Sequence, residues 1–289
     1  MKTISRRQFL GKSALGAGAA LFLSRESLGL TSQPFGLPVS QPIGFQVWTV
    51  RDALMKDFDG TLRQMADLGY QTVEMCSPPG YYFAPLMKMT AKEMRAAIDT
   101  TGLQCTSCHY QFKELRENLD DRIAFAKELG LEQMILSTFG ISQKAPMADW
   151  LKAADELNKL GERTKKEGMQ LGFHNHDFEF KEIDGVLIYD ALMDRFDPEL
   201  IKMQFQVAVI SIGYKAATYF NKYPNRFISM HLADWSSALG KSVPVGQGVV
   251  DWKELFTAAK TGGVKNFFVE MERETFKDSY TFLHDLKIE

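Results

Sequence analysis

The scarcity of cysteine and of excess charge removes several classes of protein from consideration. The chain has three cysteines, and so small an odd number argues against a disulfide framework. Cys105 and Cys108 have the spacing of a redox pair, but in an extended strand their thiols point to opposite faces, so we expect buried thiols. Lysine and arginine total 34 against 36 for aspartate and glutamate, giving a net charge of −2. That balance offers no basic field to a phosphate backbone, so nucleic acid is not an expected partner.

Three common catalytic signatures are also missing. The sequence contains no G-x-S-x-G elbow for a nucleophilic serine and no P-loop for nucleotide phosphates. No G-x-G-x-x-G turn follows the first predicted strand, which disfavours a doubly wound, dinucleotide-binding sheet.

The N-terminal segment has a short apolar run but no long one. Arg6 and Arg7, followed by Phe9 and Leu10, look like a twin-arginine export signal. The apolar stretch after them, residues 14–23, is too short for a stable membrane span. We therefore expect a signal segment over residues 1–30, a proline-containing linker over 31–43, one folded domain over 44–289, and a periplasmic mature protein.

One unit recurs from Gly44 onward: an amphipathic helix closes on a glycine, and an apolar run begins within two residues. Glycine supplies the left-handed cap that ends such a helix and returns the chain to the sheet. Helices between strands require parallel pairing with right-handed crossovers. The predicted strands are Gly44–Trp48, Gln71–Met75, Leu103–Cys108, Gln133–Ser137, Gln170–His174, Ile201–Gln206, Phe227–His231 and Asn266–Glu270. The predicted helices are Gly60–Leu68, Ala91–Thr100, Glu117–Leu129, Ala148–Glu167, Val186–Phe196, Ala216–Lys222, Trp252–Thr261 and Phe276–Leu286. Alternating strands and helices in this number predict an α/β fold, the (β/α)8 TIM barrel.

Four of the five histidines fall at or just past the ends of predicted strands. His109, His174, His176 and His231 occupy these positions, and only His284 lies elsewhere. Active sites of such barrels are built at the carboxyl ends of the strands, so this placement predicts one polar site. Carboxylates join it there from Glu74, Asp234 and Glu270.

Histidines and carboxylates converging on one barrel mouth suit a divalent transition metal with open coordination positions. Such an ion polarises a carbonyl or hydroxyl, and a nearby base then moves the proton of the adjacent carbon. A glycosidase using two carboxylates and a sugar-binding mouth without metal remain alternatives.

A family resemblance becomes specific at these residues. The segments GFQVWTVRD, GYQTVEM, GFHNHDFEF, HLAD, GQGVVDW and FFVEMERE occur in order from Gly44 to the C-terminal region. Together they resemble the sugar phosphate isomerase/epimerase family, the xylose isomerase-like TIM barrels, in a branch of exported proteins acting on 3-keto-glycosides. The resemblance implies a metal-dependent isomerase, epimerase or lyase that abstracts a proton next to the carbonyl of a sugar or keto-sugar.

The metal set that the resemblance implies is a carboxylate from strand 5, Asp from strand 6, His from strand 7 and Glu from strand 8. His231 and Glu270 match the last two, and Glu179 is our choice for the first, with His174 as the alternative. Gln206 stands where the pattern has Asp, and as a neutral amide it is a weaker ligand for Mn, Co, Zn or Mg.

The remaining roles follow from the same positions. Predicted proton-transfer groups are His176, His109, Glu179 and Glu270, and predicted substrate contacts are Trp48, Glu74, His174, Asn175, Asp234 and Gln247. The expected partner is a small carbohydrate, and the pattern predicts no particular oligomeric state. Two other functions stay open: a carbohydrate-binding barrel with catalysis weakened by Gln206, and an endonuclease-type barrel, which the charge balance disfavours.

Overall fold

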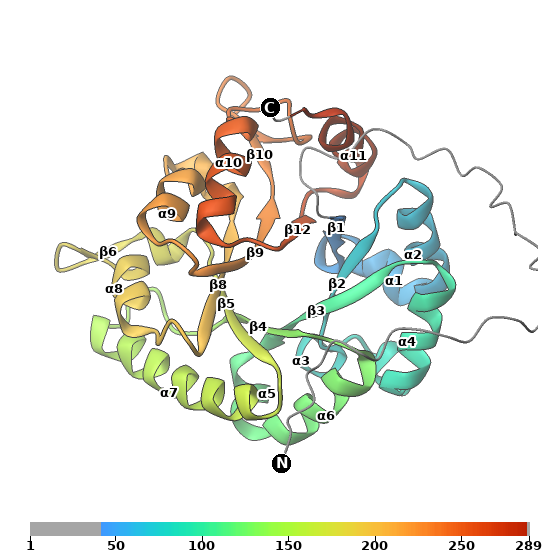
Figure 1. The fold of residues 1–289 in the computed structure, drawn as a ribbon, viewed down its shortest axis with the longest axis horizontal. Helices are drawn as coiled ribbons and strands as arrows, with labels where there is room; N and C mark the ends of the chain where they lie inside the picture. The colour runs from blue at the N-terminus through green and yellow to red at the C-terminus, as the bar shows by residue number, and fades with distance from the viewer. Residues whose placement is uncertain (1–41, 288–289) are drawn as a thin grey trace, which may run out of the picture. The chain divides into compact units, whose positions relative to one another are not determined.

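A computed structural model describes residues 42–287, and eight parallel strands in this range pair into a closed barrel (Figure 1). The strands are β1 (Ile43–Gln46), β2 (Thr72–Cys76), β3 (Gln104–Gln111), β4 (Gln133–Thr138), β5 (Gln170–His174), β8 (Ile201–Gln206), β9 (Phe227–Leu232) and β12 (Asn266–Val269). The ring closes because β1 pairs with β2 on one side and with β12 on the other. The predicted (β/α)8 barrel is confirmed.

At least one helix follows each strand, and together the helices surround the barrel (Figure 1). The main helices are α2 (Phe58–Asp67), α4 (Ala91–Thr100), α6 (Leu119–Leu129), α7 (Met147–Lys166), α8 (Ile188–Arg195), α9 (Ala216–Lys222), α10 (Trp252–Gly262) and α11 (Phe276–Asp285). Shorter helical turns are η1 (Val47–Val50), α1 (Arg51–Lys56), α3 (Pro78–Tyr81), η2 (Leu86–Lys88), α5 (Phe112–Glu117), η3 (Phe178–Phe180), η4 (Val207–Ile212) and η5 (Arg273–Thr275). Two hairpins, β6–β7 (Glu182–Ile183, Val186–Leu187) and β10–β11 (Asp234–Ser236, Lys241–Val243), lie in loops after strands. Within residues 42–287, no helix has the length and apolar composition needed to cross a membrane.

Local sequence explains where the helices begin and end. Thr90 and Glu93 form a reciprocal capping box at the start of α4, which satisfies two main-chain N–H groups that have no partner inside the helix. Gly130 ends α6 in the left-handed conformation, with φ +80°, as expected from its place before β4. These signals are local, which is why the predicted helix positions agree closely with the observed ones.

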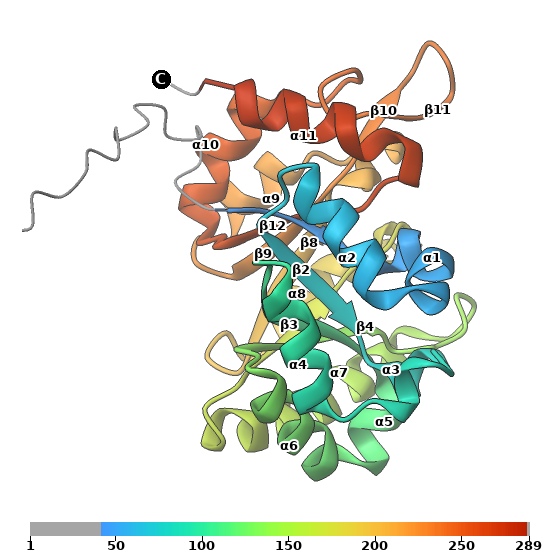
Figure 2. The ribbon, with the colours of Figure 1, turned by 90° about the vertical axis from the view of Figure 1, so that its right-hand side faces the viewer.

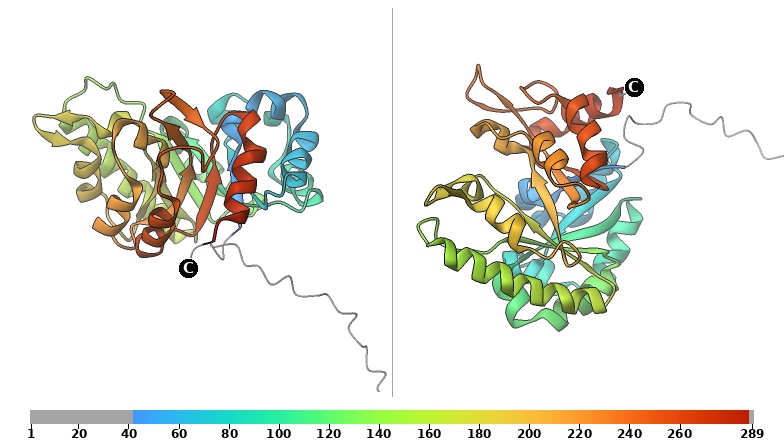
Figure 3. Two further views of the ribbon diagram at one scale, coloured as in Figure 1. Left: turned by 90° about the horizontal axis from the view of Figure 1, so that it is seen from above. Right: turned by 60° about the vertical axis from the view of Figure 1, so that its left-hand side comes forward.

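The last helix seals the barrel beside its first strand. Phe276 of α11 contacts Tyr70 and Phe45, with ring centroids 5.6 and 6.2 Å apart. Figures 2 and 3 show α11 alongside the segment from β1 to α2, although these segments are far apart in the sequence. Gly44 of β1 is required between the two neighbouring strands, since a Cβ there would lie 2.2 Å from Thr72 Oγ1 of β2 and 2.6 Å from a ring carbon of Phe268 of β12.

Two predicted strand ends differ from the observed ones in ways that affect the mouth of the barrel. β3 runs on to Gln111 because it continues to pair with β4, so His109 lies within the strand instead of after it. β1 stops at Gln46, where the chain turns into η1 and the Gln46 side chain accepts a hydrogen bond from the Trp48 main-chain nitrogen. Trp48 therefore stands on the rim. The predicted signal segment and most of the predicted linker lie outside the described residues, and Ile43 already belongs to β1.

Candidate active site

Three histidines from different strands meet at the centre of the mouth. His109 of β3, His174 of β5 and His231 of β9 are all buried, and their rings lie 4.5 to 5.2 Å apart between centroids. One ring nitrogen from each lies within 4.8 Å of the others, a grouping able to hold one metal ion. Among the described residues, this is the one group of at least three His, Cys, Asp or Glu side chains that meets that criterion. The predicted convergence of strand-end histidines thus places three of them together.

His231 is held between two carboxylates. Its Nε2 lies 2.6 Å from Glu74 Oε2, and its Nδ1 lies 2.9 Å from Glu270 Oε2. Burial by itself lowers the pKa of His231, but attraction to Glu270 and Glu74 outweighs burial and raises the pKa to about 9. Burial raises the pKa of both carboxyls, but the neighbouring histidines outweigh it and lower the pKa of Glu74 and of Glu270. In the metal-free protein at neutral pH, His231 is therefore an imidazolium between two carboxylates.

Gln204 of β8 fixes the orientation of His109. Its amide nitrogen donates to Glu74 Oε1 at 2.8 Å and to Ser229 Oγ at 2.9 Å. Its amide oxygen must therefore accept, and the partner at 2.6 Å is His109 Nε2. His109 Nε2 also faces Glu74 Oε2 at 3.2 Å, and an acceptor on both sides requires a hydrogen on this nitrogen. With a hydrogen on Nε2, the ring nitrogen of His109 left to bind a ligand is Nδ1.

Sequence reasoning missed Gln204 and its two serine neighbours. Gln204, Ser107 and Ser229 lie two residues before Gln206, His109 and His231, and Ser107 donates to Glu74 at 2.6 Å. Residues two apart on a strand point to the same face. The two-residue spacing from Gln206, His109 and His231 could therefore have identified these three side chains as part of the site.

The β5 end supplies neutral polar atoms without protein partners. His174 Nδ1, Asn175 Nδ2 and His176 Nδ1 are buried and lack a hydrogen-bond partner in the protein. Burial, and then repulsion from His231 and other histidines, lowers the pKa of His174 well below its usual value. Burial is also the main cause that lowers the pKa of His176, to about 4. Neutral imidazoles with an open nitrogen are suited to bind a metal or accept a proton.

Glu179 does not join the histidine cluster, unlike the predicted metal set. It lies on η3, where one carboxylate oxygen accepts from the His176 main-chain nitrogen at 2.8 Å and the other has no partner. Burial raises its pKa to about 8. The short turn at η3 directs the side chain to the main chain, so His174, the predicted alternative, takes the β5 position in the cluster.

Gln206 faces Glu270 with its nitrogen. Nε2 of Gln206 donates to Glu270 Oε2 at 2.5 Å, while its oxygen accepts from the Ala208 main-chain nitrogen at 3.2 Å. The main-chain nitrogen of Gln206 donates to Asn175 Oδ1 at 3.2 Å. In this arrangement the amide oxygen predicted as a metal ligand is already engaged.

Asp234 and Gln247 lie in the loop after β9, and the structure gives neither a place in the histidine network. The Asp234 carboxylate is buried and accepts hydrogen bonds from the loop itself. Gln247 is exposed. Trp48 is 40 % exposed, with the Arg51 guanidinium 4.1 Å above its ring and Tyr81 packed at its edge. Their predicted contacts with a substrate stay predictions.

A cavity of about 400 Å³ borders the network at Glu270. Its walls come from segments that follow β1, β8, β9 and β12, and Glu270 is the network residue that lines it. The Glu270 side chain keeps 14 % of its surface exposed, whereas those of Glu74 and His231 are fully buried. A ligand in this cavity therefore reaches the network through Glu270.

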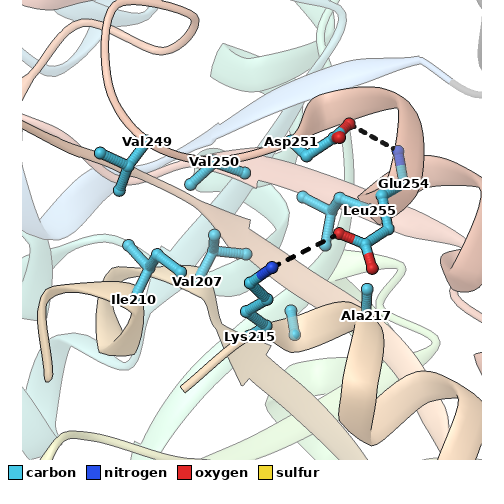
Figure 4. Close-up of a pocket in the computed structure, with 10 residues that line it drawn as sticks. Val207, Ile210, Lys215, Ala217, Val249, Val250, Asp251, Glu254 and Leu255 are labelled. Carbon is cyan, nitrogen blue, oxygen red and sulfur yellow. Dashed lines mark hydrogen bonds and ion pairs between the residues drawn. The ribbon is translucent and has the colours of Figure 1, made fainter. Parts of the chain in front are cut away.

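A second hollow lies among η4, α9 and the start of α10 (Figure 4). It measures about 40 Å³, and valine, isoleucine and leucine side chains form much of its wall beside the Lys215–Glu254 ion pair. None of the predicted site residues lines it, and it is too small for a sugar.

Residues 62–286 match the sequence model of the xylose isomerase-like TIM barrel. The chain belongs to this family. The resemblance inferred from the sequence is thereby confirmed.

Proteins similar in sequence to this chain include two inosose dehydratases. The enzyme of Geobacillus thermodenitrificans is 24% identical over 216 residues, covering 62% of this chain and 72% of that enzyme. The enzyme of Clostridium beijerinckii is 25% identical over 162 residues, covering 49% of this chain and 54% of that enzyme, so the match spans about half of its length.

Solved structures of other proteins share the fold. A sugar phosphate isomerase/epimerase from Parabacteroides distasonis superposes with a TM-score of 0.73 at 22% identity, covering 89% of this chain and 96% of that one. The IOLI protein with a bound zinc atom superposes with a TM-score of 0.61 at 15% identity, covering 84% of this chain and 95% of that one.

Proposed function

We propose that this chain is a metal-dependent enzyme that abstracts a proton next to the carbonyl of a sugar or keto-sugar. Isomerisation through an enediol, epimerisation at the carbon next to a carbonyl and elimination from a keto-sugar all begin with that step. The observation that carries the proposal is Glu270, a carboxylate that lines the cavity and is bonded directly to the histidine cluster. The relatives named inosose dehydratase support an elimination on a keto-sugar of the inositol type.

The donor set fits a divalent transition metal. His109, His174 and His231 would hold it, His231 only after it gives up one of the protons that it shares with Glu74 and Glu270. Three histidines with an open position are a known catalytic zinc arrangement. Imidazole ligands favour zinc or cobalt over magnesium, which prefers oxygen. A bound ion there would polarise a carbonyl oxygen and acidify the neighbouring C–H. The zinc-binding IOLI protein, similar in fold, is consistent with this choice.

The chain's own residues then handle the proton. Glu270 is ionised at neutral pH and faces the cavity, so its carboxylate is the group placed to accept the proton. Gln206 and His231 each donate a hydrogen bond to the same Glu270 oxygen and hold it in place. His176, with a neutral ring and an open Nδ1, is the second group for proton transfer, while His109 is positioned by Gln204.

One observation favours a second function, sugar binding without turnover. Gln206 stands where the family pattern has an aspartate, so the site has one negative charge less for holding a cation. The amide oxygen of Gln206 already accepts a hydrogen bond from the Ala208 main-chain nitrogen. We also propose export to the periplasm on the strength of Arg6 and Arg7, which lie outside the described residues.

Turnover of an inosose tests the proposal. The purified protein, stripped with a chelator and reloaded with Zn²⁺, Co²⁺, Mn²⁺ or Mg²⁺, would be incubated with an inosose and with neutral ketoses, and products followed by NMR. We expect conversion that chelation abolishes and that zinc or cobalt restores best. Saturable sugar binding without conversion under any metal would support the binding protein, and neither binding nor conversion would reject both.

A further inference from the structure

Five hydrogen-bond donors converge on one buried carboxylate in the loop after β9. Asp234 is 2 % exposed, and its two oxygens accept four main-chain N–H groups and one indole N–H. The donors are Trp235 N (2.9 Å), Gly246 N (3.0 Å), Gly248 N (3.0 Å), Val250 N (3.2 Å) and Trp252 Nε1 (3.1 Å).

Such a convergence of main-chain N–H groups is the architecture of an anion-binding site. Barrels of this kind frequently bind phosphate with the loops after their seventh and eighth strands, and β9 is the seventh strand of this barrel. Gly248 packs so closely on Asp234 that a Cβ there would lie 2.1 Å from its carboxylate oxygen. The loop is thus wrapped around an anion that the chain itself supplies, and these five donors are unavailable to a phosphate.

The two cations in the cavity wall are also engaged. Arg51 donates to the Trp48 main-chain oxygen at 2.7 Å, and its guanidinium stacks on the Trp48 ring. Arg273 donates to Gln64 Oε1 at 2.8 Å. Three carboxylates, Glu270, Glu272 and Glu274, line the same cavity, so its wall carries more negative than positive groups.

We infer that the mouth takes an uncharged, polyhydroxylated ligand and discriminates against its phosphate monoester, with Asp234 occupying the place of the phosphate. The inference rests on the proposed function for the identity of the site as a sugar site. Carboxylates accept hydrogen bonds from ligand hydroxyls, and guanidinium groups donate hydrogen bonds to them. A phosphate dianion is repelled by the same carboxylates and finds no free group of N–H donors to offset that repulsion.

Binding of inorganic phosphate to the full-length protein as purified tests this inference. Isothermal titration at millimolar phosphate would compare the wild type with Asp234→Ala, and Asp251→Ala is the matched control. Asp251 is in the same loop but caps α10 through a single main-chain nitrogen, that of Glu254. We expect no saturable phosphate binding by the wild type or by Asp251→Ala, and saturable binding by Asp234→Ala. The lowered Tm of Asp234→Ala should rise with phosphate or formate and not with sodium chloride of equal ionic strength.

Saturable phosphate binding by the wild type, or none by a folded Asp234→Ala, would overturn the inference. If Asp234→Ala does not fold, the titration of the wild type with phosphate decides the question alone, because Asp234→Asn would still fill the space that a phosphate needs. These readouts need no turnover, so they stand apart from a failure of the proposed function. Where turnover is found, kcat/KM for the sugar should exceed that for its phosphate monoester at least tenfold, and the reverse order would also contradict the inference.

Discussion

The side-chain nitrogen of Gln206 lies 2.5 Å from Oε2 of Glu270, at the point where the buried network meets the cavity. An amide at position 206 thus donates to the carboxylate that is placed to accept a proton. An aspartate there would place a second anion beside Glu270. The side chain at position 206 therefore decides whether Glu270 receives a hydrogen bond or the site gains a second anion for a metal.

Gln206→Asp should raise the affinity for a divalent metal about tenfold or more, on the order of 1.4 kcal/mol. The same change should lower the Tm of the metal-free protein, because the new carboxylate repels Glu270 and the hydrogen bond that Gln206 donates to Glu270 is lost. Isothermal titration with Mn²⁺, Co²⁺ and Zn²⁺ measures the first effect. Gln206→Asn, as short as aspartate and uncharged, is the control and should not gain affinity. Equal affinities for wild type and Gln206→Asp with all three metals would show that position 206 is not beside the ion.

The stability of the metal-free protein should depend on pH through the His231 network. The pKa of His231 is raised from 6.5 to about 9, so its contribution is complete below about 6.5 and lost as pH rises through about 9. The pKa of Glu270 is lowered from 4.5, so its contribution is present above 4.5 and lost as pH falls below that value. Maximum stability from this network is expected between those limits.

Glu270→Gln should move the alkaline loss of stability to lower pH, since it removes one of the two carboxylates that raise the pKa of His231. Tm measured against pH and histidine NMR titration would detect the change. His284→Gln, at a histidine whose side chain is 58% exposed, should leave both profiles unaltered. An unchanged His231 titration in Glu270→Gln would argue against the pairing seen in the structure.

Gln204→Leu should weaken metal binding and loosen His109. The substitution leaves Glu74 and His109 each short of a partner, and a buried unpaired polar group costs about 1–3 kcal/mol. In ¹⁵N NMR of the metal-free protein, we expect a weaker preference of His109 for hydrogen on Nε2, because Glu74 Oε2 at 3.2 Å is then the acceptor left at that nitrogen. Ser229→Ala, which removes one neighbour of Gln204, should have a smaller effect on both stability and tautomer. A tautomer ratio of His109 in Gln204→Leu equal to that of the wild type would contradict the positioning role.

Much of the fold could be predicted from the sequence because its signals are local. Helices that end on glycine before apolar runs, such as the one closed by Gly130, specify the βα repeat without reference to distant residues. Strand-end position then brought His109, His174 and His231 together, because the carboxyl ends of the barrel strands share one face.

The rest of the site depends on contacts that only the closed barrel creates. Gln204 acts through residues 25, 95 and 130 positions away in the sequence, and no local pattern reports such partners. Glu179 was expected at the metal, but a short helical turn directs it to the His176 main chain. Asp234 stays a predicted substrate contact, and the sequence did not indicate that its carboxylate accepts hydrogen bonds from the loop that follows it.

Replacing Arg6 and Arg7 with lysine should retain the precursor in the cytoplasm, because a twin-arginine signal depends on the arginine pair. Cell fractionation with immunoblotting measures the distribution, and Lys12→Arg, which preserves the pair and the charge, is the control. Undiminished periplasmic accumulation of the lysine variant would rule out this signal.

Deuterium incorporation from D₂O is the measurement that tests proton abstraction most directly. The metal-loaded protein would be incubated in D₂O with an inosose, and exchange at the carbon next to the carbonyl followed by NMR. Exchange should be rapid with the wild type, fall by at least about a hundredfold in Glu270→Gln, in line with the loss of a general base, and persist in His284→Gln. Exchange in Glu270→Gln at the wild-type rate would contradict its role as base. No exchange by the wild type with any metal would contradict the proposal that the protein is an enzyme that abstracts this proton.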